Sequence, residues 1–235
     1  MILFGINPIL MVAAIVPAIV LLYQVYKHDR LEKESNGLIV RLVVMGIIST
    51  LIAAALETVG SMVLGMFFQR ATTLYYLILT FVVVGVSEEL SKYVLLKKVT
   101  WNNPEFNCKF DGVIYAVAVG LGFALWENIK YVAAYGIATA LVRAVTAVPG
   151  HACFGVFMGV FYAMAKMYAN RGEEGKSRIC RRLAVEVPVL LHGTYDFIAM
   201  RESGVISLTF VVFVIILFVI AFRLVKKTSA EDTYI

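Results

Sequence analysis

The sequence has few charged residues for its length of 235 residues. Only 16% of the residues are charged, whereas soluble domains carry about 25%. The apolar share is 61%, and the mean hydropathy is +0.85. A soluble core of this size has no room for so much apolar surface, and a disordered chain would be far more polar. The composition therefore predicts a protein that lies in a lipid bilayer.

Cysteines are also scarce, and basic runs are missing. The three cysteines, Cys108, Cys153 and Cys180, lie far apart and form no CxxC pair. Their spacing and odd number exclude a disulfide framework and a thiolate zinc site, so we expect buried or reduced thiols. The net charge of +5 comes without a basic run interleaved with aromatic residues. We expect no nucleic-acid partner.

Seven apolar segments alternate with short polar connections. Each is close to the roughly 20 residues that a helix needs to cross about 30 Å of hydrocarbon. None has the strict two-residue alternation of a barrel strand. We predict an all-α integral membrane protein, a polytopic bundle of about seven transmembrane helices that forms a single domain over residues 1–235. The predicted spans are 8–26, 38–60, 73–96, 112–135, 144–168, 183–200 and 205–224.

The orientation follows from the basic residues between the spans. With seven spans, sixteen Lys and Arg residues fall on one side and four on the other, and Lys92 lies inside a span. Basic residues gather on the cytoplasmic side of membrane proteins. We therefore predict an outside N-terminus and a cytoplasmic C-terminus.

Ionisable side chains within the predicted spans are the strongest functional signal. A charge at the middle of a span costs about 2.5–3.5 kcal/mol when it faces lipid, so these groups are expected to face one another or a wet cavity. Helical spacing and depth allow one shared site in the middle to outer half of the bilayer. The candidates lie in the third to sixth spans: Glu88, Glu89, Lys92, Glu127, Asn128, His151, His192 and Asp196.

Several chemistries use such a set. A buried Glu beside a His can take a proton from water and give it to a leaving amine, with His192, Asn128 or Lys92 as oxyanion donor. Zinc is an alternative because two histidines and several acids are present, although no HExxH spacing supports it. The same groups could serve a proton-coupled transporter or a non-catalytic scaffold. Glu57, in the second span, is expected to be structural.

The order of these motifs resembles the PrsW family. The resemblance covers about residues 1–227, with one motif on each of four spans. The motifs are Glu88-Glu89-Leu90-Ser91-Lys92 (EExxK), Phe123 to Glu127-Asn128 (FxxxEN), a lone His151 preceded by Arg143, and His192 to Asp196 (HxxxD).

This resemblance implies a multi-pass protease of the bacterial cell membrane. Members of the family make the first cut in a single-pass, membrane-anchored anti-sigma factor, and a second protease then releases an extracytoplasmic-function sigma factor. The expected substrate is therefore a single-pass membrane protein, and the expected surroundings are the lipid bilayer. No cofactor is expected, with zinc as the alternative; its ligands would be His151, His192, Glu127 and Asp196.

Site roles come from a further likeness to CAAX-processing and bacteriocin-immunity proteases. By motif, Glu88 is the water-activating base, Glu89 or Glu88 pairs with Lys92, and His192 helps to hold the oxyanion. The sequence departs from that pattern because Glu127 replaces the second-motif His and Asp196 replaces the fourth-motif Asn. His151 would then supply the imidazole that partners the base, with Asn128 and Arg143 in support.

Overall fold

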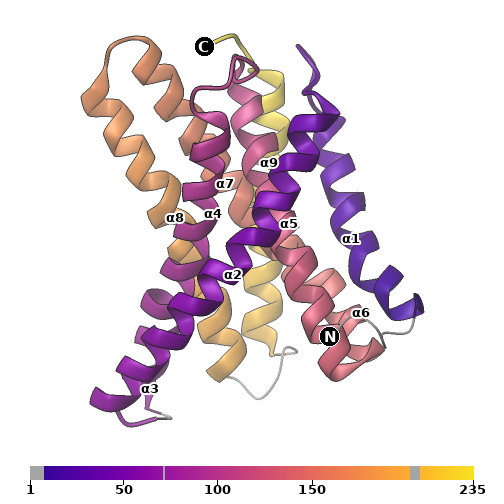
Figure 1. The fold of residues 1–235 in the computed structure, drawn as a ribbon, viewed down its shortest axis with the longest axis vertical. Coiled ribbons are helices and arrows are strands. Elements are labelled where there is room, and N and C mark those ends of the chain that lie inside the picture. The colour runs from indigo at the N-terminus through magenta and orange to yellow at the C-terminus, as the bar shows by residue number, and fades with distance from the viewer. Residues whose placement is uncertain (1–7, 71, 202–206) are drawn as a thin grey trace.

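The computed structural model describes residues 8–70, 72–201 and 207–235, and Figure 1 shows that this part of the chain is helical. It contains no strand, and one isolated bridge pairs Cys108 with Tyr234. The helices are α1 (Pro8–Tyr26), α2 (Asn36–Phe67), α3 (Thr73–Leu77), the π-helix η2 (Ile78–Gly85), α4 (Val86–Thr100), α5 (Lys109–Tyr135), α6 (Ile137–Val145), α7 (Ala147–Asn170), α8 (Glu174–Arg201) and α9 (Leu208–Ala230).

The helices confirm the predicted all-α membrane fold. Among the described residues, six helical stretches are long and apolar enough to cross a membrane, and α1 adds a shorter apolar helix. All three cysteines are free and buried, as expected. The direction of the bundle across the bilayer, with the N-terminus outside, stays a prediction.

Two predicted spans are not single α-helices. The third consists of α3, η2 and α4, so a π-helical stretch directly precedes Glu88 and Glu89. The fifth is broken at Thr146, between α6 and α7. Pro149 explains this break, because its missing N–H removes the hydrogen bond that would continue the helix back to Val145. α6 is thereby free to turn toward α5.

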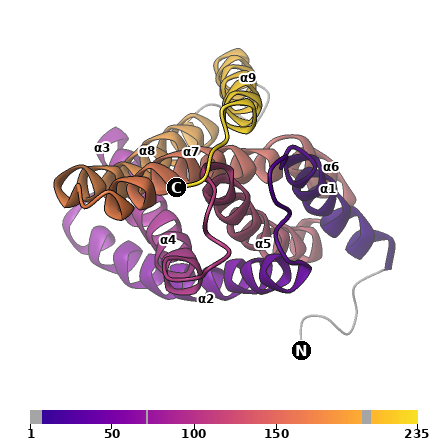
Figure 2. The same ribbon diagram turned by 90° about the horizontal axis from the view of Figure 1, so that it is seen from above.

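α5 lies at the centre of the bundle. Seen from above in Figure 2, it lies between α2 and α7, with α1 and α4 on its flanks. The apolar stretch of α5 is 83% buried, whereas that of α2 is 33% buried. α5 is therefore the helix on which the others pack.

Small residues let α7 approach α5 closely. A Cβ atom at Gly159 would collide with the backbone of Gly112 and Val113, and one at Gly155 would collide with Ala116 and Val117. Glycines four residues apart share one helix face, and such faces allow backbone contact between membrane helices. This seam fixes the position of His151, one turn before Gly155, against α5.

The end of the bundle near the C-terminus contains a group of four acidic residues and one tyrosine, all buried except the partly exposed Asp232. We call it the loop cluster, and its members are Asp29, Glu34, Asp111, Tyr115 and Asp232. The Tyr115 hydroxyl donates a hydrogen bond to Glu34 Oε2, and Phe110 N–H donates to Asp232 Oδ1 at 2.9 Å. Asp111 Oδ2 accepts from the N–H groups of residues 107 and 108. Hydroxyl and backbone groups therefore join the loops to the start of α5.

Candidate active site

α4 supplies three ionisable side chains on one face. Glu88, Glu89 and Lys92 occupy i, i+1 and i+4, so the ammonium lies over both carboxyl groups. Lys92 Nζ donates to Glu88 Oε2 at 3.1 Å and to Glu89 Oε1 at 2.8 Å. The same ammonium lies 3.9 Å from the centre of the Phe123 ring. Lys92 therefore contacts both acids. The sequence alone did not decide between Glu88 and Glu89 as its partner.

His151 extends this network from α7 to α5. Its Nδ1 lies 3.2 Å from Lys92 Nζ, and its Nε2 lies 3.0 Å from Glu127 Oε2. Because an ammonium only donates, Nδ1 is assigned as the acceptor and Nε2–H as the donor to Glu127. His151 was predicted to supply the imidazole that partners the base, and this role stays a prediction. Its hydrogen bonds go to Lys92 and Glu127, so it reaches Glu88 through the ammonium.

Arg143 holds Glu127 from the other side. Its Nη2 donates to Glu127 Oε2 at 2.8 Å, and its Nε donates to Asn128 Oδ1 at 3.2 Å. Asn128 in turn donates through Nδ2 to the backbone oxygen of Ala14 at 3.0 Å. The turn between α6 and α7 is what points Arg143 back toward α5. Of the predicted supporting residues, Arg143 therefore contacts Glu127 directly, and Asn128 acts on it through Arg143.

α8 brings His192 and Asp196 to the same network. His192 Nδ1 lies 2.8 Å from Glu89 Oε1, and its Nε2 lies 3.4 Å from Asp196 Oδ2. The His192 ring stacks on Phe154, with 4.9 Å between ring centres. These contacts fix the imidazole plane between two carboxyl groups.

All nine residues predicted for the site thus lie together, and we call them the motif cluster. α7 packs against both α5 and α8, and α4 contacts α5 and α8. Six members are at most 5% exposed, namely Glu88, Glu89, Lys92, Asn128, His151 and His192. Charged groups buried in a membrane bundle are costly unless they are paired, and every charge here has a partner. The catalytic roles of these residues stay predictions.

A cavity of about 230 Å³ adjoins the motif cluster. Glu88 lines this cavity, whereas Glu89 and Lys92 lie behind its wall. Of the two adjacent acids, only Glu88 can therefore reach a molecule in the cavity. The complete lining is Glu57, Val84, Glu88, Glu127, Tyr131, Arg143, Ala147, His151, Phe154, His192, Tyr195, Asp196 and Met200.

The sequence reading missed part of this wall. Glu57, expected to be structural, lies on it, as do Phe154 and the aromatic residues Tyr131 and Tyr195. An ionisable residue inside a span was an available signal for Glu57. The aromatic residues carry no such signal because membrane spans contain many of them.

The positions of the side chains show whether the site could bind a metal ion. Among the described residues, Glu88, Glu89, His151 and His192 each offer a ligand atom, and these atoms lie within 4.8 Å of one another. This set differs from the ligands suggested by the sequence, which included Glu127 and Asp196. Lys92 Nζ lies within 3.2 Å of three of the four side chains. The arrangement does not fit a metal ion while the ammonium holds that position.

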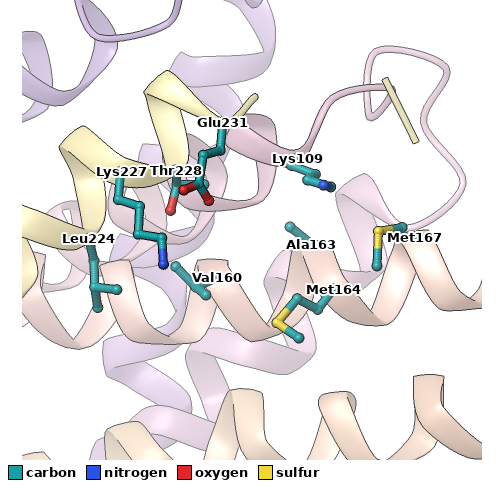
Figure 3. Close-up of a pocket in the computed structure, with 9 residues that line it drawn as sticks. All are labelled: Lys109, Val160, Ala163, Met164, Met167, Leu224, Lys227, Thr228 and Glu231. Atoms are coloured by element: carbon teal, nitrogen blue, oxygen red, sulfur yellow. The ribbon is translucent and has the colours of Figure 1, made fainter. Parts of the chain in front are cut away.

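A second cavity, of about 320 Å³, lies between α7 and α9 near the start of α5 (Figure 3). Its walls combine apolar side chains with Lys109, Lys227 and one carboxylate, Glu231. It contains no histidine, so it lacks the paired acid and imidazole found beside the first cavity. The first cavity is therefore the candidate active site.

The chain is similar to known proteins over most of its length. Residues 34–222 match the family described as "PrsW family intramembrane metalloprotease". Protease PrsW of Halalkalibacterium halodurans is 33% identical over 223 residues, which cover 95% of this chain and 98% of the relative. Protease PrsW of Oceanobacillus iheyensis is 32% identical over 228 residues, covering 95% and 97%.

A further relative, Protease PrsW of Bacillus subtilis, is 33% identical over 210 residues, covering 86% of this chain and 88% of the relative. No solved structure matches the chain. The apolar helices and these relatives together indicate a multi-pass bacterial membrane protein.

Proposed function

Because this chain belongs to the PrsW family of intramembrane proteases, we propose that it cuts a membrane-anchored anti-sigma factor with a water molecule activated by Glu88. This would be the first cut in releasing an extracytoplasmic-function sigma factor. The anti-sigma substrate rests on the family resemblance of the four motifs. The site chemistry rests on the geometry of the motif cluster.

Access to the cavity is the observation that favours Glu88 over Glu89 as the base. It is the member of the EExxK motif that lines the cavity, and its Oε2 is held by Lys92 at 3.1 Å. Glu89 is only 1% exposed and bonds to both Lys92 and His192. A base needs to reach its substrate, whereas a positioning residue needs fixed partners. Glu88 meets the first requirement and Glu89 the second.

The reaction follows from these positions. Glu88 takes a proton from water as the water oxygen attacks the carbonyl carbon of the scissile bond. His192 lines the cavity, and its Nε2–H turns from Asp196, 3.4 Å away, to donate a hydrogen bond to the oxyanion that forms. Glu88 then gives its proton to the leaving nitrogen as the C–N bond breaks. The products are a carboxylic acid and an amine, which ionise to a carboxylate and an ammonium, and Glu88 is again ionised.

The remaining residues of the motif cluster hold Glu88 and His192 in place. Lys92 orients Glu88, and the chain from Lys92 through His151 and Glu127 to Arg143 limits how far the ammonium can move. Asp196 lies beside the second nitrogen of His192. A preorganised set of charges lowers the barrier without reorganisation during the reaction.

The proposal assigns no step to a metal, because the Lys92 ammonium lies among the donor atoms that an ion would use. Zinc hydrolysis would require Lys92 to move away. A chelator distinguishes the two mechanisms.

The test is cleavage of the tagged anti-sigma factor of the source bacterium, co-expressed with the protease at matched membrane levels. We expect a shortened fragment with wild type and with Glu186→Gln, an exposed Glu-to-Gln control on α8. Glu88→Gln, Glu89→Gln and His192→Ala should remove the fragment. A fragment that persists in all three variants would assign the cut to another enzyme.

Whether cleavage requires a metal ion is tested with purified protein in proteoliposomes. With Glu88 as the base and no metal, EDTA and phenanthroline should leave the cleavage rate unchanged. Loss of cleavage with a chelator and recovery on adding zinc would contradict the proposed mechanism, although the protease assignment would stand.

A further inference from the structure

Glu57 is the ionisable side chain that α2 brings to the cavity. One turn earlier, Ala53 is buried, and one turn later, Gly60 packs against Val83 of η2. α2 therefore holds Glu57 at a fixed height on the cavity wall. A carboxyl group at this place in a span has a cost of about 2.5–3.5 kcal/mol if it faces lipid, so its presence calls for a partner.

No hydrogen bond or ion pair joins the Glu57 carboxyl group to another residue in the described part of the chain. The other acids of the wall differ in this respect. Glu88 is held by Lys92, Glu127 by Arg143 and His151, and Asp196 lies beside His192. Glu57 is thus the wall carboxylate that is left for a molecule inside the cavity.

The wall as a whole is acidic. Four carboxyl groups line it, while Arg143 is the one guanidinium and is already bonded to Glu127. A cavity with surplus carboxylates attracts cationic groups and repels anionic ones. A positively charged group would complement Glu57 without competing for the partners of Glu88.

We propose that Glu57 binds a Lys or Arg side chain of the substrate beside the scissile bond and so determines which sequence is cut. This inference rests on the proposed function, since it concerns the substrate of the same cavity. It makes Glu57 a specificity residue, separate from the groups that move protons.

The experiment is a charge exchange between enzyme and substrate. Each substrate residue within one helical turn of the mapped cleavage site is replaced in turn by Lys or Glu, and kcat/KM is measured in proteoliposomes. At one position, wild type should prefer the Lys substrate over the Glu substrate by at least about 10-fold. Glu57→Gln should bring this ratio close to one, and Glu57→Lys should invert it.

The ratio decides the result, whatever the absolute rates are. Wild type without a preference at any position, or Glu57→Gln with the wild-type ratio, would overturn the inference. Glu57→Asp, which keeps the charge, should keep the sign of the preference and provides a second variant if Glu57→Lys does not fold. Glu186→Lys controls for charge elsewhere on the protein. Continued cleavage by Glu88→Gln would instead refute the proposed function.

Discussion

The two ends of α5 carry acids in opposite settings. Asp111, in the first turn, belongs to the loop cluster and accepts hydrogen bonds from backbone N–H groups. Glu127, near the other end, belongs to the motif cluster and bonds to Arg143 and His151. The carboxyl group is fully buried at one end and 16% exposed at the other, and the two groups differ in what they contact.

The loop cluster contains no cation–carboxylate pair among the described residues. Glu34 is 5% exposed, and burial raises its pKa from an ordinary value near 4.5 to about 9, with the nearby Asp111 carboxylate acting in the same direction. Burial likewise raises the pKa of Asp29 to about 6. Burial therefore shifts Glu34 and Asp29 toward the protonated form, whereas the acids of the motif cluster are paired with Lys92, Arg143 and histidines.

Access separates the two clusters further. The motif cluster lies on a cavity, and Glu88 reaches into it. The loop cluster is covered by the loops and by the C-terminal residues, where Ile235 N–H donates to Asn107 O and Lys109 N–H donates to Thr233 O. A buried acid alone therefore does not indicate a site. The combination of charge pairing and an open cavity does.

The largest effect on stability is expected from Glu89→Gln, because this carboxylate bonds to Lys92 and His192 together. Breaking a buried ion pair costs about 3–5 kcal/mol, so the unfolding midpoint should fall by roughly 10 °C. Misplacing the reacting groups should also lower the cleavage rate at least about 100-fold. Thermal unfolding in detergent and cleavage in proteoliposomes measure the two effects.

Glu89→Asp is the matched variant for this prediction. It keeps the charge with a shorter side chain, so it should recover stability more than activity. An unfolding midpoint for Glu89→Gln equal to that of wild type would show that the motif cluster is not held by this carboxylate.

A smaller effect is expected from Arg143→Gln. Glu127 would keep its contact with His151 and lose the guanidinium, so the cleavage rate should fall by about 10-fold with the protein still folded. Arg143→Lys should recover part of the rate, since it keeps the charge and loses the second bond, to Asn128. Arg182→Gln, an exposed change on α8, is the control. Equal rates for Arg143→Gln and the control would show that Arg143 of α6 does not contribute to cleavage.

The smallest effect on the cleavage rate is expected from Glu34→Gln. This variant should instead change how the stability of the protein depends on pH. Between about pH 4.5 and pH 9 the folded protein keeps a proton on Glu34 that the unfolded chain releases, so the stability of wild type falls as pH rises through this window. Glutamine does not titrate. The fall in unfolding midpoint from about pH 6 to about pH 9 should therefore be smaller in Glu34→Gln than in wild type, by several °C.

Glu186→Gln again provides the control, since this side chain is exposed. A wild-type pH dependence in Glu34→Gln would mean that other groups, such as Asp29, cause it. The proposed difference between the two clusters, unpaired acids in the loop cluster and paired charges in the motif cluster, would then lack support from Glu34.

Much of the fold could be predicted from hydropathy. The length of each apolar stretch indicates a helix because lipid offers no hydrogen bonds to the backbone. Hydropathy contains no information on breaks within a stretch, so it missed η2 before Glu88. The break at Thr146 depends on Pro149, and proline inside membrane helices is too common to predict a break by itself.

The membership of the site was predictable for a related reason. Intramembrane charges require partners, and the i, i+4 spacing placed Glu88 with Lys92 and His192 with Asp196. The pairing between helices was not predictable, because it depends on side-chain direction in space. The predicted role of His151 as partner of the base therefore did not include its hydrogen bonds to Lys92 and Glu127.

The central claim is that the motif cluster is catalytic and the loop cluster is structural. Its most direct test is the cleavage rate of purified wild type, Glu88→Gln and Glu34→Gln in proteoliposomes, with folding checked by thermal unfolding. We predict that Glu88→Gln loses about 10²–10⁴-fold in rate while it remains folded. Glu34→Gln should cut at a rate close to wild type. Full activity in Glu88→Gln, or an equal loss in Glu34→Gln, would contradict the account.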